Sequence, residues 1–417
     1  MTIKMPRVHD TRIKDQLWEL GLSSLQALET ERGILASGRE EIYGCIFGRD
    51  SLITSLTLLR VYEKTKDPYF LSLVRKVLFH LAELQGREIN IESGEEPGKC
   101  IHEYRTEGYE HLIGENNAHW YLYPDKILRN YDSVDATPLF LMTVHAYYRA
   151  SHDDEFIDTL LPNIKAALDW LFEYGDTNGD GFIDYRFHPD RTYGGLRTQS
   201  WMDSTESLFH EDGRAVPYPI APVEVQAYTY VALRAWAEYF ETKKPLLSEK
   251  LEKRARELKI LFNTKFVLRK ASGRISLAFA IDGNGRQLRS PRSTMGHVLW
   301  TVWRGKDGMP ESVLDAQYIA RLADRIFSRD LYVQRAGVRT LSNRSRFYDP
   351  ASYHNGSIWP HDTAMLVEGL ENFGLDAEAK RVRTALLRAY VHFETPIELF
   401  TYSKRSYHEY SRGEGLG

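Results

Sequence analysis

Residues 221–266, "APVEVQAYTYVALRAWAEYFETKKPLLSEKLEKRARELKILFNTKF", predict two long helices joined by a very short turn. Apolar residues recur at helical spacing over 221–242 and again over 246–266. Pro222 stands where the first turn of a helix tolerates proline. Because only residues 243–245 separate the two patterns, we expect the helices to form an antiparallel pair.

Further stretches of the chain repeat this helical spacing. They cover residues 11–30, 51–64, 68–85, 134–151, 156–174, 292–304, 312–327, 357–373 and 376–393. Short connections such as 65–67 and 374–375 close the pairs at one end.

The remaining connections are long and rich in Gly, Asp, Tyr and His. They cover residues 31–50, 86–133, 175–220, 267–291 and 328–356. Loops longer than about 15 residues in a compact domain usually carry function or small strands. The pattern therefore predicts an all-α toroid of paired helices, with long loops, small β-hairpins and the functional site on one face.

Composition narrows the class of protein. No change in composition marks a linker, so we expect a single catalytic domain, residues 1–417. The net charge of −4 and the lack of a dense basic tract argue against nucleic acid as a partner. No run of about 18 apolar residues and no signal-peptide core occur, which argues against a membrane. Two cysteines, Cys45 and Cys100, make no disulfide framework, so we expect a cytoplasmic protein; the sequence predicts no oligomeric state.

An acid beside an indole, in "RTQSWMDSTES" (197–207), is the first candidate for chemistry. Asp203 follows Trp201 by two residues. An apolar ring that removes water from a carboxyl group destabilises the anion and raises the pKa, as a general acid near neutral pH requires. An acidic surface turn would explain the same residues.

Similar polar clusters stand in the other long loops and at the helix starts that follow them. They are "FGRDS" (47–51), "CIHEYR" (100–105), "YDSVDATP" (131–138), "APVEVQ" (221–226), "STMGHVLW" (293–300), "YHNGSIWPHD" (353–362) and "TPIELFTY" (395–402). The chain has no Ser–His–Asp order with a nucleophile elbow and no HExxH zinc spacing. Carboxylates among aromatics favour glycoside hydrolysis, in which one carboxyl group protonates the leaving oxygen and a second activates water or attacks the sugar.

Seven stretches, in this order, resemble the bacterial and archaeal amylo-α-1,6-glucosidases, which are glycogen-debranching-type glycoside hydrolases related distantly to the glucoamylases. They are "FGRDSLITSL", "DATPLFL", "DTNGDGFIDY", "SWMDS", "APVEVQAYTYVALR", "YHNGSIWPHDTAMLVEGL" and "PIELF". The resemblance covers roughly residues 20–402. It implies an (α/α)6 toroid and inverting hydrolysis of α-glucosidic bonds, with no cofactor.

Carried over position by position, the resemblance makes Asp203 the general acid and Glu398, in "PIELF", the general base. Arg49 and Asp50 look like the pair that holds the terminal glucose. In an inverting enzyme the two carboxyl groups stand about 6.5–9.5 Å apart, with water between them. The other expected substrate-binding residues are His102, Glu103, Asp135, Trp201, Glu224, Gln226, His354, Asn355, Trp359, His361 and Asp362.

Two features depart from that family. Its longer members carry a β-sandwich before the toroid, and its members continue past the "ELF" segment into a last helix. Here "SKRSYHEYSRGEGLG" follows, so we expect the last barrel helix to be absent or replaced by residues 403–417.

The stretch "DTNGDGFIDY" (176–185) raises the question of a metal. Its residues Asp176, Asn178, Asp180 and Asp184 resemble the first part of a calcium loop. Phe187 stands where such a loop requires a glutamate. Calcium binding and an Asx-rich turn are both open interpretations, and no other metal is expected.

The leading hypothesis is therefore an inverting α-glucosidase that releases glucose from glucans or oligosaccharides, above all at α-1,6 linkages. Alternatives are a hydrolase of a small glucoside such as trehalose or glucosylglycerate, and a non-catalytic sugar-binding toroid. A toroid that epimerises free sugars would need histidine pairs in place of opposed carboxylates.

Overall fold

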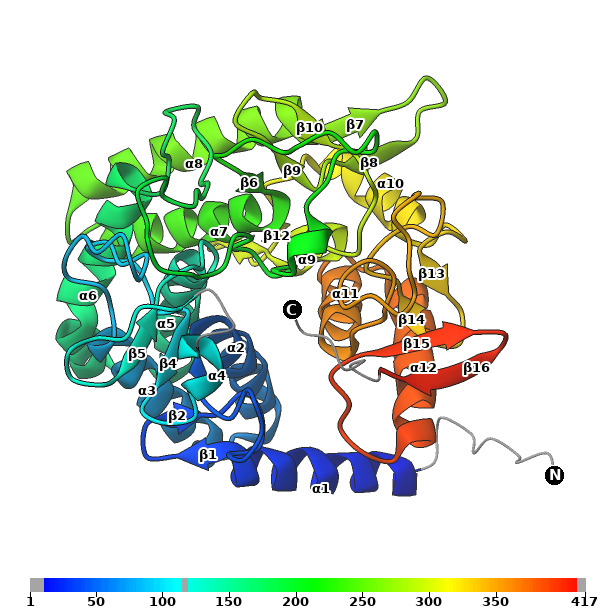
Figure 1. Ribbon diagram of the computed structural model, residues 1–417, viewed down its shortest axis with the longest axis horizontal. Coiled ribbons are helices and arrows are strands. Elements are labelled where there is room, and N and C mark those ends of the chain that lie inside the picture. The colour runs from blue at the N-terminus through cyan, green and yellow to red at the C-terminus, as the bar shows by residue number, and fades with distance from the viewer. Residues whose placement is uncertain (1–10, 115–118, 411–417) are drawn as a thin grey trace.

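The computed structural model describes residues 11–114 and 119–410, and helices dominate it. Five inner helices pack one against the next around a centre (Figure 1). They are α2 (Gly48–Thr65), α5 (Ala136–Ser151), α7 (Val223–Phe240), α9 (Met295–Trp300) and α11 (Pro360–Asn372). Five outer helices back them: α3 (Pro68–Glu83), α6 (Asp154–Glu173), α8 (Pro245–Lys265), α10 (Ala316–Ile326) and α12 (Asp376–Phe393).

Helix α1 (Thr11–Leu28) lies across the opening between the first and last pairs (Figure 1). The fold is thus the expected all-α toroid of the (α/α)6 type. Each helix that the periodicity predicts is present. The short helix α4 (Glu110–Ile113) is an addition that the sequence pattern does not indicate.

Local sequence explains how these helices begin and which of their faces are buried. All but two of the 18 residues of α7 are buried, because this helix is enclosed by α5, α8 and α9. Asp67 and Asp153 cap α3 and α6, and each side chain accepts a hydrogen bond from a backbone N–H of the first turn.

Helix α9 is shorter than its sequence pattern predicts. The pattern covers residues 292–304, whereas the helix spans six residues, Met295–Trp300. The chain leaves the helix because β11 (Trp303–Arg304) pairs with β12 (Pro310–Glu311). Tertiary pairing overrides the helical periodicity here.

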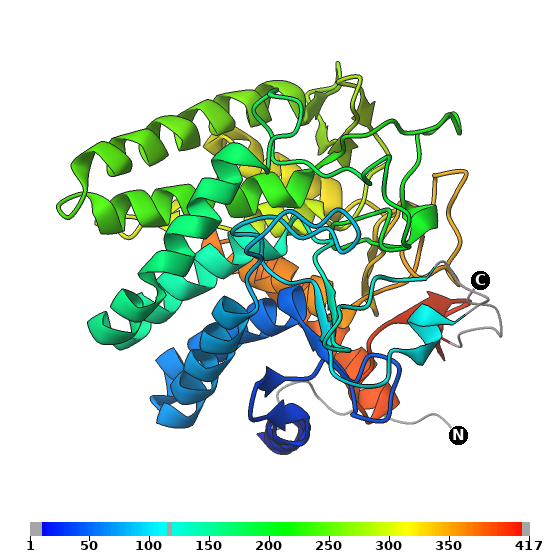
Figure 2. The same ribbon diagram turned by 60° about the vertical axis from the view of Figure 1, so that its left-hand side comes forward.

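The long connections gather on one side of the toroid (Figure 2), where they form small antiparallel sheets. Two sheets have three strands: β3 (Ile46–Phe47), β4 (Glu103–Arg105) and β5 (Leu128–Asn130); β6 (Ala221–Pro222), β9 (Ala280–Ile281) and β10 (Gln287–Leu288). The hairpins are β1 (Glu29–Thr30) with β2 (Gly33–Ile34), β7 (Val267–Arg269) with β8 (Ile275–Leu277), β11 with β12, β13 (Tyr332–Val333) with β14 (Gly337–Val338), and β15 (Phe400–Ser403) with β16 (Ser406–Glu409).

One large cluster of buried apolar side chains runs through the helix pairs, and a small second cluster lies under the β15–β16 hairpin. Residues 403–409 of the segment expected to replace a barrel helix belong to this hairpin, whereas residues 411–417 lie outside the described residues. The extent of the domain stays a prediction. Within residues 11–114 and 119–410, no helix combines the length and apolar character that a membrane span requires.

Candidate active site

A cavity of about 840 Å³ opens among the long loops, and both predicted catalytic carboxylates, Asp203 and Glu398, line it. The cavity wall comes from α1, from the segments on either side of β3, and from the loops that precede α11 and follow α12. Seven of the predicted substrate-binding residues also line it: Arg49, Asp50, His102, Trp201, His354, Trp359 and His361.

Asp203 is placed as a proton donor requires. Its side chain is 28% exposed, and its carboxylate lies 3.4 Å from the Arg49 guanidinium. Burial among protein atoms raises the pKa of Asp203 to about 7; Arg49 opposes this shift, and the charges of Asp135 and Asp50 add to it. Asp203 therefore keeps its proton to a higher pH than an ordinary aspartate, as a general acid near neutral pH requires.

Arg49 connects Asp203, which lines the cavity, to a second carboxylate that lies beneath the lining. Its Nε lies 3.1 Å from an oxygen of the buried Asp135, and one terminal nitrogen donates to the Ser200 carbonyl at 3.1 Å. The neighbouring carboxylates, Asp135 first, hold the pKa of Arg49 above its usual value in spite of burial. Arg49 thus fixes the position of Asp203. Because its charge is shared with Asp135, it only partly offsets the negative charge of the Asp203 carboxylate.

A close backbone contact at Gly48 sets the start of α2 and so the place of Arg49. The Gly48 N–H donates to the His102 carbonyl at 2.9 Å. A Cβ at Gly48 would lie 2.1 Å from the Ile101 carbonyl oxygen, so no larger residue fits. The residue after Arg49, Asp50, is exposed toward the cavity, and the protein around it raises the pKa of its carboxyl group.

Glu398 lies near the C-terminus, in the loop between α12 and β15, and its side chain is exposed. One of its oxygens accepts a hydrogen bond from the Tyr353 hydroxyl. Burial and the nearby Glu398 raise the pKa of Tyr353, so its phenol keeps its proton. Tyr353 stands in the "YHNGSIWPHD" stretch but was not among the predicted site residues; its position next to His354 was the available signal.

Aromatic rings form a wall beside Asp203. The Trp201 ring lies 5.1 Å from that of His361 and 5.9 Å from that of Trp359, and the His354 ring stacks on Trp359 at 5.2 Å. Burial lowers the pKa of His361 to about 4 and that of His354 well below its usual value. These imidazoles are neutral near pH 7, so the wall offers rings and hydrogen bonds to a sugar rather than charge.

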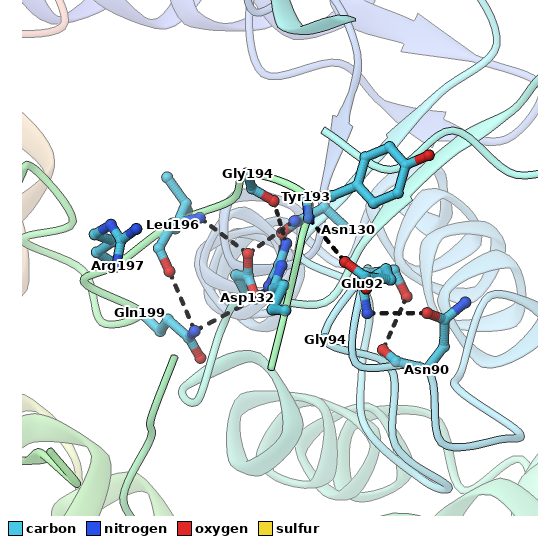
Figure 3. Close-up of polar contacts among 12 residues, drawn as sticks. Asn90, Glu92, Gly94, Asn130, Asp132, Tyr193, Gly194, Leu196, Arg197 and Gln199 are labelled. Atoms are coloured by element: carbon cyan, nitrogen blue, oxygen red, sulfur yellow. Dashed lines mark hydrogen bonds and ion pairs between the residues drawn. The ribbon is translucent and has the colours of Figure 1, made fainter. Parts of the chain in front are cut away.

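A network around Asp132 holds the loop that leads to Asp203 (Figure 3). The buried Asp132 carboxylate accepts from Arg191 at 2.7 Å and from the Leu196 N–H at 2.9 Å. Gln199 and Asn130 also donate to it, and the Gln199 carbonyl accepts from the Val134 N–H. The network joins residues 130–134 to 191–199, just before Trp201. Sequence reasoning placed Asp132 inside a polar cluster but did not select it.

A family comparison decides the class of this protein. The family described as "Mannosylglycerate hydrolase MGH1-like glycoside hydrolase domain" matches residues 127–396, which is more than half of the chain. The chain belongs to this glycoside hydrolase family. A comparison with curated proteins finds no significant match.

Solved structures share the fold of this glycoside hydrolase. The GH63 mannosylglycerate hydrolase from Thermus thermophilus, in complex with Tris, matches with a TM-score of 0.63 and 16% identity over 94% of this chain and 96% of that one. The same enzyme with Tris and D-glycerate matches with a TM-score of 0.64 and 14% identity, over 95% and 96%. A wild-type structure named simply as a glycosidase matches with a TM-score of 0.56 and 14% identity, over 89% and 83%.

The glycoside hydrolase class inferred from the carboxylate and aromatic clusters is thus confirmed. The comparisons do not support the finer assignment to the amylo-α-1,6-glucosidases, because the description of the matched family names mannosylglycerate hydrolase instead.

Two further predicted binding residues lie beneath the cavity rather than on its lining. Asp135 pairs with Arg49. Glu224 is fully buried, and burial raises the pKa of its carboxyl group to about 7. Within residues 11–114 and 119–410, neither of its oxygens has a hydrogen-bond partner.

Four other predicted residues are outside the lining and make structural contacts. Glu103 pairs with Arg105, and Gln226 bonds the backbone of Ile183 through both ends of its amide. Asn355 bonds Arg292 and the Glu206 carbonyl, and Asp362 accepts from His297 at 2.9 Å. These contacts are within the protein and do not test whether the four residues bind substrate, so that role stays a prediction.

In the candidate calcium stretch, aspartate side chains accept hydrogen bonds from backbone N–H groups of the same stretch and so form a turn. Asp176 accepts from the N–H groups of Asp180 and Gly181. Asp184 accepts from the backbone and hydroxyl of Thr177, and burial raises its pKa to about 7. In the part of the chain that the structure describes, no three or more His, Cys, Asp or Glu side chains gather as metal ligands would. The contacts fit an Asx-rich turn, and calcium binding at this stretch stays a prediction.

Proposed function

We propose that this chain is an inverting glycoside hydrolase in which Asp203 is the general acid and Glu398 the general base. The observation that carries the proposal is that both carboxyl groups line one cavity in different surroundings. Asp203 has a pKa raised to about 7, whereas Glu398 is exposed and accepts a hydrogen bond from Tyr353. Two carboxyl groups whose surroundings differ in this way suit acid and base roles.

The reaction uses one water and no covalent intermediate. Asp203 gives its proton to the glycosidic oxygen as the bond to the anomeric carbon breaks. Glu398 takes a proton from the water that attacks the same carbon on the opposite face of the ring. An α-glycoside is thereby released as a β-sugar. Tyr353 orients Glu398, and Arg49 orients Asp203.

We propose a small α-hexoside of glycerate as the substrate. The description of the matched family supports this choice, as does the name of the Thermus thermophilus enzyme that shares the fold. The cavity, at about 840 Å³, falls within the range of roughly 300–1,000 Å³ that is usual for small-molecule sites.

A neutral glucoside, such as trehalose or an α-1,6-linked oligosaccharide, is the second candidate. Glycerate carries a carboxylate, which calls for a cationic partner. Among the described residues that line the cavity, Arg49 is the single arginine or lysine, and its guanidinium is already shared between Asp135 and Asp203. This pairing favours a leaving group without charge.

A substrate panel with product NMR tests both the reaction and the substrate. We expect β-sugar as the first product from mannosylglycerate or glucosylglycerate. Release from trehalose, isomaltose or panose but from neither glycerate glycoside would favour the neutral glucoside instead. Asp203→Asn and Glu398→Gln should each lower kcat by at least about a thousandfold. Glu206→Gln is the matched control, because this exposed acid lies three residues from Asp203 and outside the cavity lining.

Release of the α-sugar would refute inversion. Full activity of Asp203→Asn would refute the assigned acid, and no release from any glycoside would favour a sugar-binding toroid.

A further inference from the structure

A second cavity, of about 400 Å³, lies on the other side of helix α12 from the candidate active site. Its lining is Arg335, Arg388, His392, Tyr402, Arg405, Ser406 and Tyr407, which come from α12, the β13–β14 turn and the β15–β16 hairpin. Helix α12 borders both cavities. Tyr390 lines the candidate active site, whereas Arg388 and His392, two residues before and after it, line the second cavity. Two residues correspond to about 200° around a helix, so the cavities meet opposite faces of α12.

The second cavity concentrates positive charge. Of the residues that the structure describes, three arginines and no acid line it. None of these three guanidinium groups takes part in an ion pair or hydrogen bond with residues 11–114 or 119–410, whereas Arg49, Arg105, Arg191 and Arg234 all pair with carboxylates. Like charges around one cavity repel each other, and an anion between them would remove that cost.

Aromatic rings that pack against each other form one side of the second cavity. The Tyr407 ring stacks on His392 at 4.7 Å and meets Tyr402 edge-on at 4.9 Å. The Tyr407 hydroxyl donates to the Arg335 carbonyl, so the hairpin is tied to the β13–β14 turn. The rings form one side of the cavity while the arginines supply the charge.

We propose that this second cavity binds a phosphoryl group, carried either by free phosphate or by a small phosphate ester. A carboxylate has two oxygens and one charge, which a single guanidinium can satisfy by two parallel hydrogen bonds. Three guanidinium groups match the three terminal oxygens and the near-double charge of a phosphoryl group. The volume exceeds what bare phosphate needs, and the aromatic side can receive the sugar of an ester.

An anion bound in the second cavity would contact residues that lie close in sequence to Glu398, the proposed general base. Strand β15 begins two residues after Glu398 and carries Tyr402. Phe400 of this strand exchanges two backbone hydrogen bonds with Ile358, next to Trp359 of the aromatic wall. An anion held by Arg388 and Arg405 would bridge α12 and the hairpin that follows Glu398.

Calorimetric titration at constant ionic strength, with inorganic phosphate and glucose 6-phosphate as probes, tests the proposal. Acetate and chloride serve as comparison anions. We expect saturable binding of at least one phosphate probe, weakened at least tenfold in Arg388→Ala and in Arg405→Ala. Tighter binding of glucose 6-phosphate would identify an ester as the ligand, and equal binding would identify free phosphate.

Arg344→Ala is the matched control, because Arg344 is exposed and lies outside this cavity; it should bind phosphate as the wild type does. Arg405 lies in the exposed hairpin turn, so its replacement should leave the melting temperature unchanged. Phosphorus NMR of the phosphate signal gives a second readout on the same variants. No saturable phosphate binding, binding that Arg388→Ala and Arg405→Ala leave intact, or acetate binding as tight as phosphate binding would overturn the proposal.

Discussion

Replacing Asp135 with asparagine tests how the proton of Asp203 is held. Asp135 lies 3.1 Å from one edge of the Arg49 guanidinium, and Asp203 lies 3.4 Å from its end. Asparagine keeps the shape of Asp135 and removes its charge. Arg49 then stabilises the anion of Asp203 without competition, so the pKa of Asp203 should fall from about 7.

The size of this shift follows from the geometry. Two carboxylates on one guanidinium are separated by about 6 Å, and at an effective dielectric constant near 20 their repulsion is about 3 kcal/mol, or roughly two pKa units. Asp203 is partly exposed, so the effective dielectric constant between the two carboxylates lies between that value and the value of water, and we expect a decrease of about one unit.

The assay is the pH dependence of kcat/KM. A general acid acts in its protonated form, so activity declines as the pH rises through the pKa of Asp203. With that pKa lowered from about 7 to about 6, kcat/KM should fall about tenfold at pH 8 and less than twofold at pH 5.

Glu206→Gln should leave the alkaline limb of the profile where it is in the wild type. An alkaline limb that stays in place or moves to higher pH in Asp135→Asn would refute this account of the general acid.

Three further changes test other parts of the site. Tyr353→Phe removes the hydroxyl that donates to Glu398, so kcat should fall about tenfold while KM changes little; an unchanged kcat in steady-state kinetics would contradict the orienting role. Asp132→Ala leaves the buried Arg191 without its carboxylate, and urea unfolding should show a loss of about 3–5 kcal/mol, with a loss under about 1 kcal/mol as the contrary result. Glu224 has a pKa raised to about 7 in the fold, so its stabilising protonation is complete at low pH and is lost as the pH rises through 7. Glu224→Gln should therefore raise the melting temperature at pH 8 more than at pH 5, and an equal effect at both would count against the buried carboxyl group.

Helical periodicity was a sound guide to the toroid because it is a local property. The pair predicted over 221–242 and 246–266 is observed as Val223–Phe240 and Pro245–Lys265. Periodicity misled at α9, where pairing of Trp303 and Arg304 with a strand six residues later ends the helix early. That pairing depends on contacts that a helical pattern does not encode.

The site could be predicted only in part. Loop motifs identified Asp203, Glu398 and Arg49 as candidates, and the structure brings all three to one cavity. The same motifs could not distinguish a side chain that lines the cavity from one that supports the fold. The side-chain amide of Gln226, for example, hydrogen-bonds the backbone N–H and carbonyl of Ile183.

The sequence alone determined the paired helices and the face on which long loops gather, because both follow from the spacing of apolar residues and from the lengths of the segments between them. Tertiary structure alone decided which polar groups meet. Arg49 and Asp203 are 154 positions apart, yet the proton affinity of the acid depends on their contact, on Asp135 behind it and on the water that the surrounding protein excludes. Those quantities depend on distance and burial in three dimensions, which no spacing along the chain specifies.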